Sequence, residues 1–249
     1  MRGKESIKKT AAEFEASFSD SSYYDAQTRD QEHLDYILKN LRIAPGMRIL
    51  DLGTGTGYLA FPLAEQNSGC GVTGLDIVAA TINRNNGKAK ERNIENLQFI
   101  SYDGEIFPFA DDSFDIAVSR YAIHHFPDIE LCFSELSRVL KPNGQLFISD
   151  PVPNRNDAGR FVDAYMQMKD DGHIRFYSLE EISDIAEKSG FAKTAFAYSK
   201  IRFPRKTAPE YAGLLEKTDD RILSLYEIEI AGDEIFITED VLNISFNLT

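Results

Sequence analysis

The chain has 249 residues, 43% hydrophobic and 27% charged, and its 27 basic and 40 acidic side chains give a net charge of −13. These proportions are near the soluble globular average and exclude wholesale disorder, a collagen-like fibre and a coiled-coil rod. The negative charge disfavours a nucleic-acid partner, because phosphates would be repelled, and no run of about 18 apolar residues predicts a membrane span.

Compartment is predicted from the N-terminus and the cysteines. The first residues are basic but contain no apolar core, so no secretion signal is predicted. Cys70 and Cys132 match no metal or redox spacing, and lone thiols are typical of a reducing compartment. We therefore expect a cytoplasmic protein with no metal site, in which both thiols are small core residues.

Alternating helical and strand-like patterns begin near residue 27. Leu34, Ile37, Leu38 and Leu41 recur at helical spacing and predict a helix over 27–41. Short apolar runs typical of buried strands in a mostly parallel sheet follow at 48–52, 71–77, 97–101, 114–119 and 145–149. Helices are predicted after Gly57, over 78–92, and from Asp128 to Pro142-Asn143-Gly144. This alternation is typical of right-handed βαβ units.

The pattern changes toward the C-terminus. Ser178 and Glu181 form a capping box that opens a helix, which Gly190 closes. A strand is predicted over 191–203, a helical stretch over 209–226, and a closing strand or hairpin over 235–246. Since no linker rich in Gly, Ser or Pro is found, we expect one domain over 1–249. Its core spans about 30–200, and its lid segments span about 1–30, 151–177 and 204–235.

The most informative segment is the loop after the first strand, Asp51-Leu52-Gly53-Thr54-Gly55-Thr56-Gly57. Glycines there let backbone N–H groups approach a ligand at a helix N-terminus. The spacing D-x-G-x-G-x-G matches neither the dinucleotide fingerprint nor the P-loop. The carboxylate of Asp51 would repel a pyrophosphate but attract an ammonium group.

Two more acidic residues follow the next two strands. Asp76 ends the second strand, where a carboxylate can accept hydrogen bonds from ribose hydroxyls, and Asp103 closes the third. The carboxyl ends of parallel strands line the crevice in which open α/β sheets bind ligands. The alternative interpretation is that these are ordinary turn residues at strand ends.

Five segments, taken in order, resemble the class I S-adenosylmethionine-dependent methyltransferases over roughly residues 30–200. They are DLGTGTG, LDI, YDGEIFPFADDSFDIAVS, YAIHHFPD and LSRVLKPNGQLFISD. The chain looks most like the small-molecule type, close to the ubiquinone/menaquinone-biosynthesis methyltransferases with a methyltransferase type 11 domain. The resemblance implies an α/β fold: a Rossmann-like, mostly parallel sheet of order 3-2-1-4-5-7-6 with seven strands, the last antiparallel, helices on both faces and helical lids.

The resemblance also implies a cofactor site for S-adenosylmethionine, with S-adenosylhomocysteine as product. The glycine loop would hold the methionine portion, Asp76 the ribose hydroxyls, and Asp103 with the next backbone N–H the adenine. The cofactor-binding residues predicted at these three places are Asp51, Gly53, Thr54, Gly55, Gly57, Asp76, Ile77, Asp103 and Gly104. A sulfonium zwitterion without phosphate suits a site lined by carboxylates.

Two further residues are candidates for the same site. Tyr24, in the pair Tyr23-Tyr24, could present an aromatic face to the sulfonium or simply pack in a lid. Arg120 ends the fourth strand and could pair with the cofactor's carboxylate or the substrate. A structural ion pair with a neighbouring Asp is the alternative for Arg120.

The chemistry itself points to the pair His124-His125 after the fourth strand. Methyl transfer is an in-line displacement in which the protein positions the nucleophile and removes its proton where it has one. Imidazole titrates near neutral pH and is a natural general base. The resemblance implies that the second histidine of such a pair lies near the pocket, so we predict His125, and second His124, as catalytic residues. Alternatively, both rings orient the loop or cap the helix at Asp128. His173 and Arg175, ahead of Ser178, are further residues that could face the pocket.

Taken together, these patterns predict methyl transfer to a small-molecule acceptor through an oxygen, nitrogen or carbon nucleophile. A non-catalytic or regulatory cofactor-binding protein is the alternative. A nicotinamide-dependent oxidoreductase is disfavoured because Gly57 comes one residue too early for the dinucleotide fingerprint. We expect no nucleic-acid or membrane partner, and the sequence leaves a homodimer open.

Overall fold

The computed structural model describes residues 7, 11–12, 15, 30–169 and 171–249. Its centre is one sheet of eight strands in the order β3-β2-β1-β4-β5-β8-β6, with β7 paired to β8 off this path. The strands are β1 (Arg48–Leu52), β2 (Gly71–Asp76), β3 (Leu97–Ser101), β4 (Phe114–Arg120), β5 (Leu140–Val152), β6 (Phe191–Lys206), β7 (Glu229–Ala231) and β8 (Glu234–Leu248).

The strand order confirms the expected topology. Strands β1 to β5 pair in parallel, and β8 runs antiparallel to both β5 and β6. Because β8 is the seventh of the expected strands, the order reads 3-2-1-4-5-7-6. The short strand β7 is an addition: it turns back onto β8 around Gly232, whose positive φ of 65° suits a hairpin turn.

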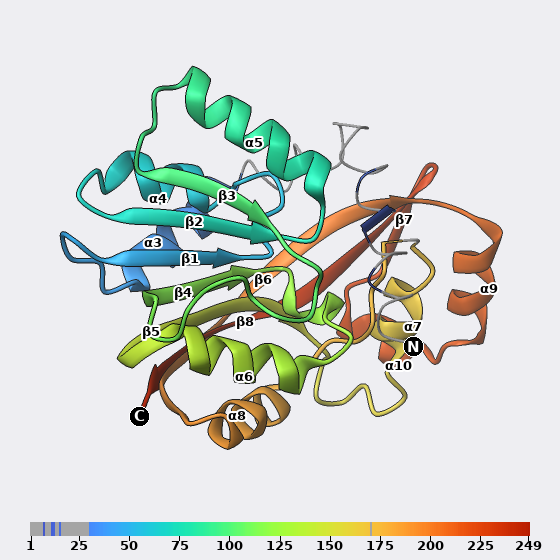
Figure 1. Cartoon of the computed structure of the whole chain (residues 1–249). Helices are drawn as coiled ribbons and strands as arrows, with labels where there is room; N and C mark the ends of the chain where they lie inside the picture. The colour runs from blue at the N-terminus through green and yellow to red at the C-terminus, as the bar shows by residue number, and fades with distance from the viewer. Residues whose placement is uncertain (1–6, 8–10, 13–14, 16–29, 170) are drawn as a thin grey trace.

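Helices cover both faces of the sheet (Figure 1). One face carries α3, α4 and α5, and the other carries α6 and α8, each with its own buried apolar cluster. The helices are α3 (Gln31–Asn40), α4 (Ala60–Gln66), α5 (Ala79–Glu91), α6 (Ile129–Val139), α7 (Phe161–Met166), α8 (Leu179–Lys188), α9 (Pro209–Lys217) and α10 (Asp220–Leu225). A 3-10 turn, η1 (Ile123–His125), precedes α6.

Local side-chain chemistry explains where several helices begin. The carboxylates of Asp30 and Asp128 cap α3 and α6 by accepting from His33 N–H and Leu131 N–H. Ser178 opens α8 with the predicted capping box. Both cysteines are buried and free, as expected from the sequence.

Two expected helix boundaries were wrong. Helix α6 ends at Val139 rather than at Pro142, because Leu140 already pairs with Phe114 before a bulge in β4 and β5. The stretch 209–226 is two helices, since Asp219 starts α10 by accepting from Arg221 N–H.

The lid segments 151–177 and 204–235 gather at one end of the sheet. Figure 1 shows β6 and β8 reaching past the other strands toward α7, α9 and α10. A third apolar cluster holds this region together, with Phe161, Tyr165 and Tyr226 among its buried rings. The expected lid over 1–30 falls almost entirely outside the described residues. None of the described helices is long and apolar enough to cross a membrane.

Candidate functional site

The glycine loop connects β1 to α4 and adopts a backbone that side chains disfavour. Gly53, Gly55 and Gly57 all have positive φ, of 70°, 48° and 83°. The N–H groups of Gly53 and Thr54 both donate to the carbonyl oxygen of Leu75 in β2, at 2.9 and 3.1 Å. The start of the loop is therefore tied to the carboxyl end of β2.

Gly53 has no room for a side chain, which gives a first testable prediction. A Cβ built at Gly53 would collide with the Cβ of Ala122. We expect Gly53→Ala to lower the free energy of unfolding by about 1–3 kcal/mol beyond the strain of its positive φ. The matched control is Gly46→Ala, since Gly46 has a φ of 86° and nothing within 4 Å of a built Cβ. Urea unfolding of both variants measures the difference, and equal losses would contradict it.

Asp51 supports the loop from inside β1. Its side chain is buried and accepts a hydrogen bond of 2.6 Å from the Thr54 hydroxyl. The pKa of Asp51 is raised to about 7, chiefly by burial; the hydrogen bond from Thr54 lowers it, and the nearby carboxylate of Asp76 adds to the rise. A positive charge bound nearby would lower this pKa and favour the ionised carboxylate.

Asp76, at the end of β2, organises the same loop from the other side. Its carboxylate accepts from Gly55 N–H at 2.8 Å and from Val78 N–H at 3.0 Å, beside the half-buried Ile77. Burial raises its pKa, and these backbone hydrogen bonds partly offset that effect. Each oxygen therefore accepts from a backbone N–H, and Asp76 remains the residue predicted to bind the ribose hydroxyls.

Asn85 of α5 completes this corner and was missed by the sequence reasoning. Its amide donates to the Gly55 carbonyl at 2.8 Å, while its buried Oδ1 has no hydrogen-bond partner in the described part of the chain. The site thus offers the unpartnered Oδ1 of Asn85, the carboxylates of Asp51 and Asp76, and glycines with positive φ. These groups suit a ligand that carries hydroxyl groups and a positive charge but no phosphate. The residues present therefore fit S-adenosylmethionine. A fully buried Asn within a polar helix gave no signal in the sequence.

Asp103 and Gly104 follow β3 at the same edge of the sheet. The exposed carboxylate of Asp103 accepts from Glu105 N–H and Ile106 N–H, at 3.0 and 3.3 Å. Gly104 has a φ of 87°, and a Cβ there would lie 2.7 Å from the side chain of Ile7. Residue 7 therefore covers the point where the adenine is predicted.

Arg120, at the end of β4, packs against the aromatic rings of neighbouring residues. Its guanidinium lies 4.1 Å from the ring centre of Tyr58 and 4.0 Å from that of Tyr121, and its Nε donates to His33 Nδ1 at 3.2 Å. Burial and the charge of Arg120 lower the pKa of His33 to about 4, so the ring is neutral. The other ring nitrogen of His33, Nε2, lies 2.9 Å from Ser149 Oγ. Tyr24 lies outside the described residues.

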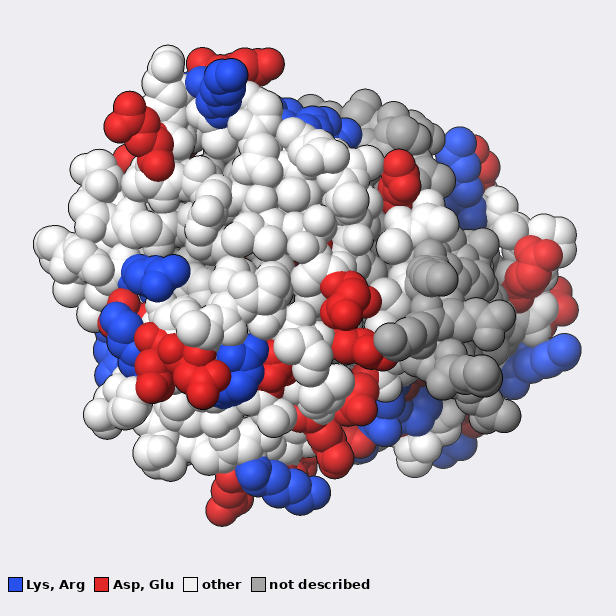
Figure 2. Space-filling model, in the orientation of Figure 1, with Lys and Arg blue, Asp and Glu red and all other residues white. Residues whose placement is uncertain are grey.

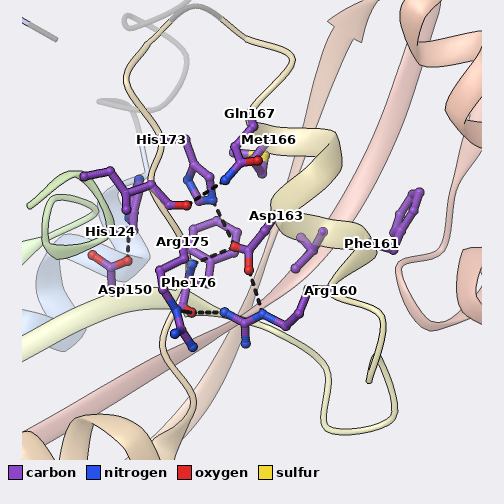
Figure 3. A network of polar contacts seen from close by, with 12 residues as sticks. His124, Asp150, Arg160, Phe161, Asp163, Met166, Gln167, His173, Arg175 and Phe176 are labelled. Atoms are coloured by element: carbon purple, nitrogen blue, oxygen red, sulfur yellow. Dashed lines mark hydrogen bonds and ion pairs between the residues drawn. The ribbon is translucent and has the colours of Figure 1, made fainter. Parts of the chain in front are cut away.

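The pair His124-His125 lies on η1, directly after β4. His124 Nδ1 is 2.5 Å from Asp150 Oδ1, and Asp150 Oδ2 accepts from Ala122 N–H and Ile123 N–H. The ring centres of His124 and His125 are 4.1 Å apart, and the ring centre of His173 lies 5.3 Å from that of His124, with the planes tilted by 42°. Figure 3 shows His124, Asp150 and His173 converging from η1, β5 and the loop before α8.

Asp163 of α7 is the second anchor of this cluster (Figure 3). It accepts from His173 Nε2 at 3.0 Å, from Phe176 N–H at 2.7 Å and from Arg160 Nε at 2.6 Å. The loop is fixed to η1 as well, since Ile174 N–H donates to the His124 carbonyl at 3.0 Å. Hydrogen bonds therefore join the loop before α8 both to α7 and to η1.

Burial controls the protonation of this cluster. It lowers the pKa of His125 to about 3, together with repulsion from His124, although a backbone hydrogen bond with Gly172 opposes the shift. It also lowers the pKa of His124 and raises that of Asp150 to about 7. Among the described residues, no group of three His, Cys, Asp or Glu side chains could hold a metal ion.

Comparison with known proteins defines the class. The chain belongs to the methyltransferase domain family, whose model matches residues 43–200. The resemblance to class I S-adenosylmethionine-dependent methyltransferases is thereby confirmed.

Two curated relatives match much of the chain. The uncharacterized methyltransferase YcgJ of Bacillus subtilis is 33% identical over 172 residues, covering 69% of this chain and 65% of YcgJ. The demethylmenaquinone methyltransferase of Thermus thermophilus is 36% identical over 121 residues, covering 48% of this chain and 54% of that protein. The match thus spans less than two thirds of either relative's length.

Solved structures share the fold. The crystal structure of YcgJ has a TM-score of 0.75 at 24% identity, covering 87% of this chain and 97% of that one. The geranyl diphosphate C-methyltransferase of Streptomyces coelicolor A3(2), solved with S-adenosyl-L-homocysteine, has a TM-score of 0.66 at 16% identity. That match covers 88% of this chain and 79% of the other.

Proposed function

We propose that this protein transfers a methyl group from S-adenosylmethionine to a small-molecule acceptor through an oxygen, nitrogen or carbon nucleophile. The observation that carries the proposal is the convergence of the glycine loop, Asp51 and Asp76 at the carboxyl ends of β1 and β2. When bound, the cofactor supplies an electrophilic methyl group that needs no further activation. Membership of the methyltransferase family supports the same reaction.

The proposed cofactor contacts follow the chain's own geometry. Gly53, Gly55 and Gly57 would hold the methionine portion with backbone groups, assisted by Thr54. Asp76 and Ile77 would hold the ribose, and Asp103 with Gly104 N–H would hold the adenine. Arg120 is placed by Tyr58 and Tyr121 and serves, in this proposal, the cofactor's carboxylate or the acceptor.

The chain's part in the chemistry is mainly to position and shield the reactants. His125 is the proposed proton acceptor for a protic acceptor, and His124 is held by Asp150 to support it. Burial keeps the His125 ring neutral, so it has no proton to lose first, but the same burial disfavours the protonated ring and makes His125 a weak base in the closed, ligand-free site. The lid cluster around Phe161 and Tyr165 supports the exclusion of water from the reacting atoms.

Surface charge supports a small-molecule acceptor over a nucleic acid. On the face shown in Figure 2, Lys and Arg side chains occur singly or beside Asp and Glu rather than in one broad basic patch. The net charge of the whole chain, −13, likewise disfavours binding to a phosphate backbone. Whether two copies associate as a homodimer stays a prediction.

Ligand-induced stabilisation tests the proposed cofactor. S-adenosylhomocysteine at 100 times its dissociation constant should stabilise the fold by about 2.7 kcal/mol, because it binds only the folded chain. Thermal unfolding with S-adenosylhomocysteine or NAD measures this. We expect a rise in Tm with the first ligand only. A rise with NAD alone would overturn the proposal.

A further inference from the structure

Glu239 on β8 has a buried carboxyl group that makes no hydrogen bond with the described residues. Its side chain is fully buried, and in the described part of the chain it is the one carboxylate whose two oxygens are both buried without a hydrogen-bond partner. Such a group is expensive to keep in a folded protein, so it calls for an explanation. Glu135 shows the ordinary alternative: it is also buried, but it accepts from Phe107 N–H at 2.8 Å and pairs with Arg138 at 2.6 Å.

The neighbours of Glu239 place it between the lid and the histidine cluster. The strand register places it near the end of β5, since the adjacent Asp240 pairs with Val152, and Asp150 of β5 pairs with Leu242. The charged groups close enough to act on its carboxyl are Arg205 of β6, Asp150 of β5, Asp163 of α7 and Asp171 of the loop before α8. Asp150 and Asp163 are the two anchors of the histidine cluster in Figure 3. Glu239 therefore belongs to the region that the proposed function assigns to the acceptor.

A second polar group without a partner, on His173, lies beside Asp163. The side chain of His173 is completely buried; its Nε2 pairs with Asp163, but its Nδ1 has no hydrogen-bond partner among the described residues. The lid brings a buried guanidinium as well, since Arg205 lies 5.7 Å from the ring centre of Tyr165 and 5.3 Å from that of Phe203. The unpartnered oxygens of Glu239 and the unpartnered Nδ1 of His173, close to a guanidinium and aromatic rings, are typical of a small-molecule site.

An apolar residue would suit position 239 structurally. Ile237 and Val241, two positions away on either side along β8, are both fully buried, and Ile201 pairs with Glu239 across the ladder. A carboxyl kept at such a position is typical of a residue that trades stability for function.

We propose that Glu239 binds the methyl acceptor by receiving a hydrogen bond from a hydroxyl or amine group of that molecule. The inference rests on the proposed function and names its substrate class: a small acceptor with an O–H or N–H donor. Burial raises the pKa of Glu239 to about 8, while Arg205 lowers it and the three aspartates raise it. The carboxyl can therefore meet a neutral hydroxyl when protonated or an ammonium group when ionised.

Unfolding of the ligand-free protein tests whether Glu239 is functional rather than structural. We expect Glu239→Leu to raise Tm by about 2–4 °C or more, because it removes a buried polar group that has no partner. The matched control Glu135→Gln should lower Tm, since it breaks the pair with Arg138. A lower Tm in Glu239→Leu would overturn the proposal, unless Glu239→Gln is more stable than the wild type.

The pH dependence of stability gives an independent measurement. The folded-state pKa of Glu239, about 8, lies above the ordinary value of 4.5, so the folded chain holds this proton more tightly than the unfolded chain. The resulting stabilisation is present below pH 4.5 and is lost as the pH rises toward 8. We expect the Tm of the wild type to fall more than that of Glu239→Gln between pH 5 and about 8. Parallel curves would contradict this assignment.

Ligand binding tests the acceptor itself, with phenol and benzylamine as probes in the presence of saturating S-adenosylhomocysteine. We expect at least one probe to raise the Tm of the wild type and none to raise that of Glu239→Leu. Glu239→Gln should keep a response to phenol but lose one to benzylamine, because the ammonium needs a carboxylate. No response of the wild type to either probe, or an equal response of Glu239→Leu, would overturn the proposal.

The cofactor arm separates this proposal from the proposed function. All variants should bind S-adenosylhomocysteine with the affinity of the wild type, because Glu239 lies outside the glycine-loop contacts. If the wild type failed to bind it, the proposed function would fail, while the stability comparison of Glu239→Leu with Glu135→Gln would still decide whether Glu239 is kept at a structural cost.

Discussion

His125→Ala should lower turnover by roughly 10²–10⁴, the usual contribution of a positioned acid or base, while leaving the affinity for S-adenosylhomocysteine nearly unchanged. The reason is its place just after β4, with its ring centre 4.1 Å from that of His124, whose ring Asp150 holds in turn. The acceptor for this assay comes from a screen of phenols, amines and small acids. Steady-state kinetics and calorimetry measure the two quantities.

The pH profile of the wild-type enzyme should differ from that of an ordinary imidazole base. Unperturbed histidine would make the rate rise through pH 6–7. Because burial lowers the pKa of His125 to about 3, its ring is neutral throughout pH 5–8, and we expect no step from this group in that range.

The control variant for His125 is His125→Phe, which keeps an aromatic ring against His124 but removes both nitrogens. Loss of turnover in both variants would support proton transfer by His125. Full turnover in His125→Phe would assign the ring to packing alone and leave positioning as the source of the rate. His124→Ala is expected to unfold more easily than either, since it would leave Asp150 buried without its partner at 2.5 Å.

Asp76→Ala should weaken the binding of S-adenosylhomocysteine by at least tenfold. A carboxylate that accepts two ribose hydroxyls loses about 1.5–3 kcal/mol for each charged hydrogen bond removed, less what water restores. The variant also removes the acceptor of Gly55 N–H, so the loop that faces the cofactor loses a contact of 2.8 Å. Isothermal calorimetry on folded protein measures the affinity.

The matched control is Asp76→Asn, which keeps one oxygen acceptor with little change in shape. We expect it to retain an affinity between those of the wild type and Asp76→Ala. Because Asp76→Ala leaves Gly55 N–H and Val78 N–H without their acceptor, we expect it to lower Tm, and Asp76→Asn, which keeps one oxygen acceptor, to lower it less. An unchanged affinity in Asp76→Ala would make Asp76 a turn residue.

The sequence by itself determined the architecture, because the signals for it are local. Apolar runs of strand length between helical repeats specify parallel βαβ units, and the observed strand order agrees. The glycine loop was readable for the same reason: glycine is the residue that adopts positive φ most readily, as at Gly53 and Gly57. Acidic residues at the ends of β1 and β2 had to share one edge, since parallel strands end together.

Only the tertiary structure decided which distant side chains meet. Arg120 contacts His33, which lies 87 positions earlier in the chain. His33 also contacts Ser149, which lies 116 positions after it. No periodicity encodes such pairs, because they depend on how α3 packs over β4 and β5. The isolation of Glu239 is likewise invisible in the sequence, where it reads as one acidic residue in a strand. Burial and the presence or absence of partners set the pKa values, and both exist only once the chain has folded.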